Sequence, residues 1–168
     1  KLTVQKDQTI LAGGPNPKND TYTVAAMTGK RRVTGIRLEA LRHPSLTRNS
    51  LSRADSGNFV LTGFEISVRH ADDAQPISIG FVRSEATYEQ ENHKISTAYN
   101  GDSKTGWAVH EGRVVDREHA AVFQFSEAIE MTAASKLTVS LRHDSPHANH
   151  NLGRFRLSVT DQVAPHLQ

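Results

Sequence analysis

The fold class of this 168-residue chain can be predicted from residues 57–68, Gly57-Asn58-Phe59-Val60-Leu61-Thr62-Gly63-Phe64-Glu65-Ile66-Ser67-Val68. From Phe59 to Val68, apolar and polar side chains alternate with a period of two, which is typical of a strand with one buried and one solvated face. The same alternation recurs in runs at 21–25, 33–41, 77–82, 121–125, 137–141 and 155–159. Such strands are characteristic of antiparallel sheets. We therefore predict an all-β fold, an antiparallel β-sandwich of the jelly-roll type with seven or eight strands.

Turn-forming clusters separate these runs, and little of the chain is left for helices. Only residues 84–99 and 126–135 have the composition for short helical turns. The length fits one domain, and we expect residues 1–168 to form a single module. The longest apolar runs are only a few residues, so no membrane insertion is expected.

Overall charge says little about partners. Twenty Lys and Arg against 18 Asp and Glu give a formal net charge of +2, which does not argue for nucleic acid. Phenylalanines lie at alternating strand positions that indicate core rather than base-stacking surface. The chain has no cysteine, which excludes disulfides and thiol chemistry, but it has nine histidines.

An internal repeat links the two halves of the sequence. Residues 41–45 (Leu-Arg-His-Pro-Ser) recur as residues 141–145 (Leu-Arg-His-Asp-Ser), and residues 61–68 resemble residues 152–159. Each copy reads as a strand, a polar loop and a return strand, so we interpret the copies as two hairpins. Because loops gather at the ends of a sandwich, both Arg-His pairs are expected on the same side.

Several segments resemble a known module. These are residues 20–24, 34–41, 57–62, 102–108 and 152–160. They are similar to a module of large multidomain planctomycete-type proteins, and that module in turn resembles the discoidin, or galactose-binding-like, jelly rolls of the coagulation factor 5/8 C-terminal type. Many carbohydrate-binding modules belong to that superfamily. The resemblance runs from about Asp7 to Thr160 and implies a binding domain, without naming the ligand.

The resemblance also implies a metal. The segment Asn100-Gly101-Asp102-Ser103-Lys104-Thr105-Gly106-Trp107 is similar to the discoidin loop that often holds a structural calcium ion. Asn100, Asp102 and Thr105 offer the hard oxygens that calcium prefers. The alternative is a plain tight turn closed by Asp102 and Thr105. Asn100 stands where an Asp is usual, which lowers the charge available to the ion. Trp107 is either core packing or a platform for a sugar ring, and Tyr88 and Tyr99 are further stacking candidates.

Arginines and histidines supply the remaining candidates for ligand contact. Arginine binds carboxylate and sulfate groups with two hydrogen bonds at once, and imidazoles donate to or accept from hydroxyl groups. His147 and His150 are spaced for a transition metal if the segment is helical, although Pro146 and Asn149 argue for an irregular loop. The predicted ligand-binding residues are Arg42, His43, Arg48, Arg53, Trp107, Arg142, His143, His147, Asn149 and His150.

No catalytic signature is present: the sequence has no nucleophile elbow, no phosphate-binding loop and no His-Glu-x-x-His motif. We therefore expect a non-enzymatic carbohydrate-binding module that recognises a polysaccharide, in particular an acidic one carrying sulfate or uronate groups. We expect it to be part of a larger exported protein, extracellular, periplasmic or at the cell surface, next to neighbouring domains. The alternatives are a structural or protein-interaction domain without a sugar site, and a lectin that uses calcium directly.

Overall fold

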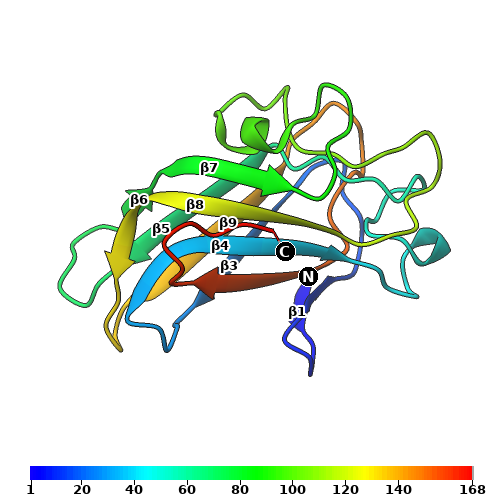
Figure 1. The fold of residues 1–168 in the computed structure, drawn as a ribbon. Helices are drawn as coiled ribbons and strands as arrows, with labels where there is room; N and C mark the ends of the chain where they lie inside the picture. Colours follow the sequence, from blue (N-terminus) through cyan, green and yellow to red (C-terminus); the bar gives the residue numbers. More distant parts are fainter. Residues whose placement is uncertain (168) are drawn as a thin grey trace.

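The structure, a computed structural model, describes residues 1–167 and consists of two antiparallel sheets packed face to face (Figure 1). The six-stranded sheet has the order β1 (Leu2–Val4), β2 (Ile10–Ala12), β10 (Arg154–Thr160), β4 (Arg32–Leu41), β8 (His119–Glu130), β7 (Phe81–Ala86). The four-stranded sheet has the order β3 (Asp20–Ala26), β9 (Lys136–His143), β5 (Gly63–Arg69), β6 (Ile77–Ile79). This confirms the all-β, antiparallel β-sandwich; the jelly-roll topology stays a prediction.

The predicted strands lie in observed strands, with differences at their ends. The run from Phe59 enters the sheet only at Gly63, and before that Leu61 makes an isolated bridge to Trp107. Strands β1 and β2 had no counterpart among the predicted runs. The helical prediction for 126–135 was wrong, because residues 126–130 continue β8 and pair in part with β4. Within 84–99, a 3₁₀ turn, η2 (Ile95–Tyr99), forms.

Aromatic side chains join the two sheets in the core. Phe64 of β5 stacks on Phe123 of β8 with ring centroids 4.1 Å apart, and Tyr22 of β3 lies parallel to Phe155 of β10 at 5.9 Å. Phe64, Phe123 and Phe155 are fully buried. The alternating positions that the sequence marks as apolar therefore form one core between the sheets.

Strand β4 is buried on both faces along much of its length because the C-terminal segment, residues 161–167, crosses the outer side of its sheet (Figure 1). Thr34 Oγ1 donates to the Gln162 carbonyl at 2.5 Å, and the Leu167 amide donates to Glu85 Oε2 at 3.1 Å. Pro165 lies against Gly35, where an added Cβ would come within 2.8 Å of the proline ring. The segment thus covers apolar surface that the sheet alone would expose.

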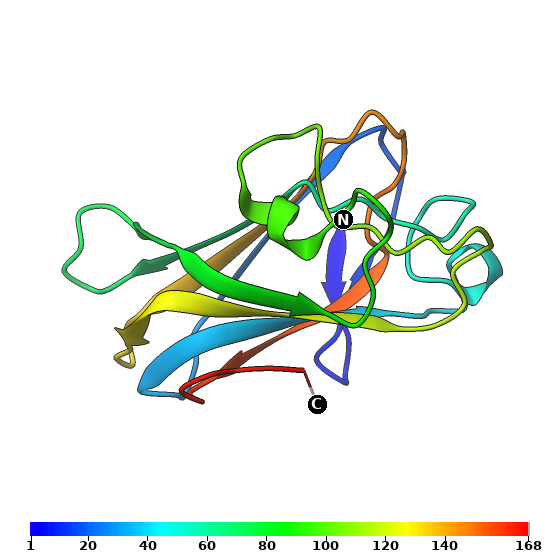
Figure 2. The same ribbon diagram turned by 45° about the horizontal axis from the view of Figure 1, so that its top comes forward.

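Four connections between strands gather at one end of the sandwich, which we call the loop end (Figures 1 and 2). They are residues 13–19, 42–62, 87–118 and 144–153. The 42–62 connection contains a short 3₁₀ turn, η1 (Thr47–Asn49). The turns at residues 27–31, 70–76 and 131–135 lie at the opposite end.

The repeated segments are not hairpins, contrary to the sequence interpretation. The first copy passes from β4 in one sheet to β5 in the other, and the second passes from β9 back to β10. Both crossings occur at the loop end, so Arg42-His43 and Arg142-His143 lie at the same end of the molecule. Their sheet pairing explains this, since the ends of β4 and β9 lie beside the starts of β10 and β5.

Candidate functional site

Three of the four predicted arginines are engaged in hydrogen bonds within the protein, and of these bonds the one from Arg53 joins two different loop-end connections. Arg42 Nε donates to the Asn49 carbonyl at 2.7 Å, and Arg142 Nη2 donates to Glu65 Oε1 at 2.7 Å. The Arg53 guanidinium donates to the Gly14 carbonyl. Arg48 is exposed, in the left-handed region with φ 53°. The structure therefore leaves Arg48 as the arginine of this set most open to a ligand.

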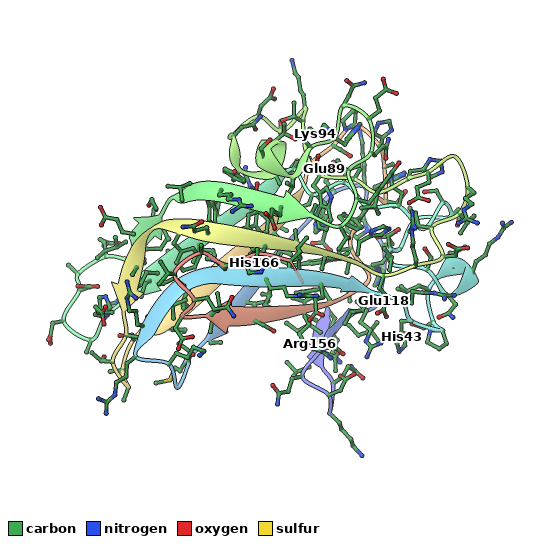
Figure 3. All side chains as sticks on the ribbon, in the orientation of Figure 1. His43, Glu89, Lys94, Glu118, Arg156 and His166 are labelled. Carbon is green, nitrogen blue, oxygen red and sulfur yellow. The ribbon has the colours of Figure 1, made fainter. Side chains whose placement is uncertain are left out.

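The two Arg-His repeats place their histidines differently. His43 is half-buried, with Nδ1 2.7 Å from Ser45 Oγ, and Figure 3 shows it near Glu118 at the end of β4. His143 is 2% exposed and packs on the Tyr22 ring, with centroids 4.9 Å apart. Burial lowers the pKa of His143 to about 4. As an interior side chain, His143 does not belong to a surface ligand site, which corrects the sequence expectation.

Trp107 and Asn149 also have internal roles. Trp107 is fully buried, donates from Nε1 to the Tyr88 carbonyl at 2.9 Å and meets Phe59 edge-on at 5.0 Å. It is core rather than a sugar platform. Asn149 has a φ of 66° and donates from Nδ2 to the Asn16 carbonyl at 2.8 Å. It connects the 144–153 loop to the 13–19 loop.

The predicted calcium loop closes on itself. Asn100 Nδ2 lies 3.0 Å from Thr105 Oγ1, and the Asp102 amide donates to Asn100 Oδ1 at 2.9 Å. Asp102 Oδ1 accepts from the Lys104 amide, also at 2.9 Å. Asn100 Oδ1, Thr105 Oγ1 and Asp102 Oδ1 are thus engaged within the turn, and Asp102 is the one carboxylate in the predicted ligand set. This donor set does not fit calcium, which takes six to eight oxygens. The tight-turn alternative describes it better.

Four histidines from two connections line a single pocket at the loop end. The 87–118 connection contributes His93 and His110, and the 144–153 connection contributes His147 and His150. The pocket has a volume of about 230 Å³ and is completed by Ser56, Asn58, Val60 and Gln90. We call it the histidine pocket. Seven of its eight lining side chains carry polar atoms, and none is a carboxylate.

Hydrogen bonds to the backbone set the tautomers of these rings. Nδ1 of His150 lies 2.9 Å from the Ala148 carbonyl, and Nδ1 of His93 lies 3.1 Å from the Glu91 carbonyl. Since a carbonyl only accepts, both Nδ1 atoms carry a proton. Nδ1 of His110 instead accepts from the Gly112 amide at 3.2 Å. In the neutral rings, Nε2 of His93 and of His150 therefore accepts, while Nε2 of His110 donates.

Two amide side chains are fixed beside the histidines. Asn58 Oδ1 accepts from the Val109 amide at 2.9 Å, and Asn58 Nδ2 donates to Gln90 Oε1 at 3.1 Å. Gln90 Oε1 also accepts from the His110 amide at 3.2 Å. These bonds orient both amides before any ligand arrives, which lowers the entropic cost of binding.

A more open groove of about 530 Å³ adjoins the histidine pocket and shares Gln90 and His110 with it. Its other lining residues are Tyr88, Glu91, Asn92, Glu111 and Arg117. The Arg117 guanidinium lies 5.9 Å from the centre of the half-buried Tyr88 ring and pairs with Glu111. We call the pocket and this groove together the loop-end groove. Nearby, Lys94 pairs with Glu89 at 3.1 Å (Figure 3).

His119 lies at the base of the 87–118 connection. It is 4% exposed, and its Nδ1 lies 3.1 Å from Thr87 Oγ1. Burial, with a smaller contribution from the charge of Arg117, lowers the pKa of His119 to about 4. It stays neutral near pH 7 and supports the strand that carries the groove.

Sequence reasoning identified His147 and His150 but missed their partners. His93, His110, Asn58 and Gln90 are spread over residues 58–110 and form no motif. The available signal was that His93 and His110 fall in a long connection between predicted strands. Within residues 1–167, no three His, Cys, Asp or Glu side chains are grouped so as to hold a metal ion. A transition-metal site at His147 and His150 is therefore not preformed.

Comparison with known proteins found no matching family model, no matching curated protein and no matching solved structure. The resemblance to discoidin-like modules accordingly rests on the sequence motifs alone. Among the described residues, no helix is long and apolar enough to cross a membrane.

Proposed function

We propose that this chain is a non-catalytic carbohydrate-binding module whose ligand, a polysaccharide, lies along the loop-end groove. The observation that carries the proposal is the polar character of this groove. Side chains from three connections meet there. They include oriented amides, imidazoles that donate a hydrogen bond and imidazoles that accept one. Sugar hydroxyl groups need such donors and acceptors together. The half-buried Tyr88 ring offers an apolar face beside them.

The acidic residues near the groove support the non-catalytic part of the proposal. Hydrolysis of a glycosidic bond usually needs two carboxyl groups that flank it. Glu111 is paired with Arg117 and Glu89 with Lys94, and no carboxylate lines the histidine pocket. Glu91 also lines the open part of the groove, but Glu111 is held by Arg117, so the groove presents one unpaired carboxylate among the described residues rather than two acids that could flank a bond.

The competing proposal, a protein-interaction domain, predicts an apolar patch at the binding end. The most exposed large apolar side chains are instead scattered outside the loop-end connections, at Val4, Met27, Ile77, Val82 and Val163. This distribution favours a polar ligand. The domain's place in a larger exported protein remains part of the proposal, because polysaccharides of this kind are met outside the cell.

Affinity electrophoresis against neutral, sulfated and uronate-bearing polysaccharides tests the proposal. We expect retardation by at least one of them, and a roughly tenfold weaker interaction for Tyr88→Ala and for His147→Ala, the loss of one good contact. Thr23→Ala, on the exposed face of β3, is the control and should bind like the unaltered protein. A chelator tests the calcium-lectin alternative and should leave retardation unchanged. If no polysaccharide retards the protein, the interaction-domain proposal gains.

A further inference from the structure

We propose that the histidine pocket is an oxyanion subsite, which takes a sulfate or carboxylate group of the ligand and binds it most tightly when its imidazoles are protonated. The inference rests on the proposed function for its natural ligand, a sugar that carries such a group. It goes further by assigning the recognition of charge to histidines rather than to the arginines that the sequence singled out.

The arginines are poorly placed for that task. Arg42, Arg53 and Arg142 already donate to internal oxygens at the loop end. Each guanidinium therefore has one N–H group engaged within the protein and presents only the remainder to an anion. The histidine pocket, in contrast, is a cavity of about 230 Å³ lined by four side chains that are able to become cationic.

The hydrogen bonds of His93 and His150 make protonation productive. Each ring already donates from Nδ1 to a backbone carbonyl, so an added proton enters at Nε2 and leaves that bond intact. Protonation converts Nε2 from an acceptor into a charged donor. Charge-assisted hydrogen bonds to an oxyanion are roughly twice as strong as neutral ones. The same two rings therefore accept from a sugar hydroxyl when neutral and donate to an anion when charged.

His110 keeps a constant role in this arrangement. Its Nδ1 accepts from the Gly112 amide, so the neutral ring donates from Nε2. A donor is what an oxyanion needs, and His110 supplies it without a change of charge. Ser56 Oγ, 3.4 Å from Nε2 of His150, and the amide of Asn58 complete the polar lining.

The charged groups around the pocket do not cancel the effect. Glu91, Glu111 and Arg117 line the adjoining groove, and Glu111 is paired with Arg117. Asp55 is exposed next to Ser56 in the 42–62 connection, and the side chain of Lys18, whose carbonyl accepts from the Asn149 amide, is also exposed. No carboxylate lines the histidine pocket to neutralise an imidazolium.

The test follows histidine ring resonances by NMR during titration with sodium sulfate and, separately, sodium acetate. Titrations at about pH 5.5 and 7.5 compare a condition that favours imidazolium with one that favours neutral imidazole. We expect shifts of the His93 and His150 resonances, with binding of at least one anion roughly tenfold tighter at the lower pH. His150→Gln, which keeps a polar side chain that cannot be protonated, should abolish most of this difference.

His166 provides a matched control. It also donates from Nδ1 to a carbonyl, that of Ala164 at 3.2 Å, but it lies on the C-terminal segment across the outer face of the six-stranded sheet (Figure 3). His166→Gln should leave anion binding unchanged. Equal affinity at the two pH values, or equal shifts at His166, would overturn the inference. Tight binding of equimolar Zn²⁺ at these rings with loss of sulfate binding would also overturn it, in favour of a metal site.

The two proposals fail in different ways. If a polysaccharide retards the protein equally at both pH values and His150→Gln has no effect, the oxyanion subsite is wrong and the carbohydrate module stands. If sulfate or acetate binds at the pocket as described but no polysaccharide retards the protein, the subsite stands and the carbohydrate proposal falls.

Discussion

Burial of the His143 imidazole makes the stability of this protein depend on pH. The ring is packed against Tyr22, and its Nδ1 lies 3.2 Å from the Asp20 carbonyl, while Nε2 is buried without a hydrogen-bond partner. An interior nitrogen that cannot reach water resists protonation. The pKa of His143 in the folded protein is lowered to about 4, against about 6.5 in an unfolded chain.

From this we predict acid destabilisation with a defined window. Above about pH 6.5 the ring is neutral in both states and the full stability is present. Between about pH 6.5 and 4, the unfolded state binds the proton and the folded state does not. The free energy of unfolding therefore decreases as the pH is lowered through this window, by about 3 kcal/mol for this one group. Urea unfolding of His143→Phe should show a flatter pH dependence across that window.

The control for this prediction is His43→Phe, which changes the corresponding histidine of the other repeat, on the surface of the loop end. It should retain the acid sensitivity of the unaltered protein. If His143→Phe loses stability with acid as steeply as the unaltered protein, the buried His143 is not the cause. The similarly buried His119, with its pKa also lowered to about 4, is the next candidate.

At the scale of elements, the C-terminal segment acts as a cover for the six-stranded sheet. Gly35 of β4 permits its approach, because a Cβ there would lie 2.7 Å from the Phe123 carbonyl oxygen and 2.8 Å from Pro165 Cγ. The carbonyl belongs to the β4–β8 pairing and the proline ring is rigid, so neither can move aside without cost.

We predict that Gly35→Ala destabilises the fold by about 1–3 kcal/mol, the usual cost of overpacking. Thermal or urea unfolding measures the loss. Gly29→Ala is the matched control: it lies in the turn before β4, and a Cβ there meets nothing within 4 Å. Equal stability of the two variants would show that the segment does not press on β4. A loss confined to Gly35→Ala supports the close packing of β4 against the Phe123 carbonyl and Pro165 together.

The crossings between the sheets are the second feature at this scale. Each repeat copy leaves one sheet and enters the other. Both polar loops are held at the same end because the end of β4 pairs with the start of β10 and the end of β9 pairs with the start of β5. This explains why loops that differ in length converge on one groove. Loops anchored in this way are suited to recognition, because a rigid scaffold positions them.

At the scale of the whole molecule, the small net charge of +2 gives little long-range attraction for a charged ligand. Binding of an acidic polysaccharide must then come from local contacts in the loop-end groove. Because these contacts are close to solvent, salt screens them.

We therefore predict that retardation by an acidic polysaccharide weakens as sodium chloride is raised from about 0.05 to 0.5 M, where the Debye length falls to a few ångströms. Affinity electrophoresis at about pH 5.5 gives the measurement. Binding to a neutral polysaccharide should change little over the same range. Salt-insensitive binding to an acidic polymer would contradict the charge-based recognition while leaving a sugar module intact.

The all-β fold and most of the interior could be predicted from the sequence, because alternating polar and apolar side chains indicate a strand with one buried face. The sequence also indicated the loop end, since the repeat marks two connections that leave strands at equivalent points. Short strands such as β1 and β2 were not predicted, because three residues are too few to show an alternation of polar and apolar side chains.

Which polar residues lie together could not be predicted, because it depends on how the loops pack against one another. The histidine of the Arg-His pair is half-buried in the first repeat (His43) and buried in the second (His143). The reason is that β9 continues through His143, whereas β4 ends at Leu41. His93, His110 and Gln90 join His147 and His150 through loop packing between residues far apart in the chain. Local sequence determines the strand period, whereas the shape of a groove depends on contacts that no local pattern encodes.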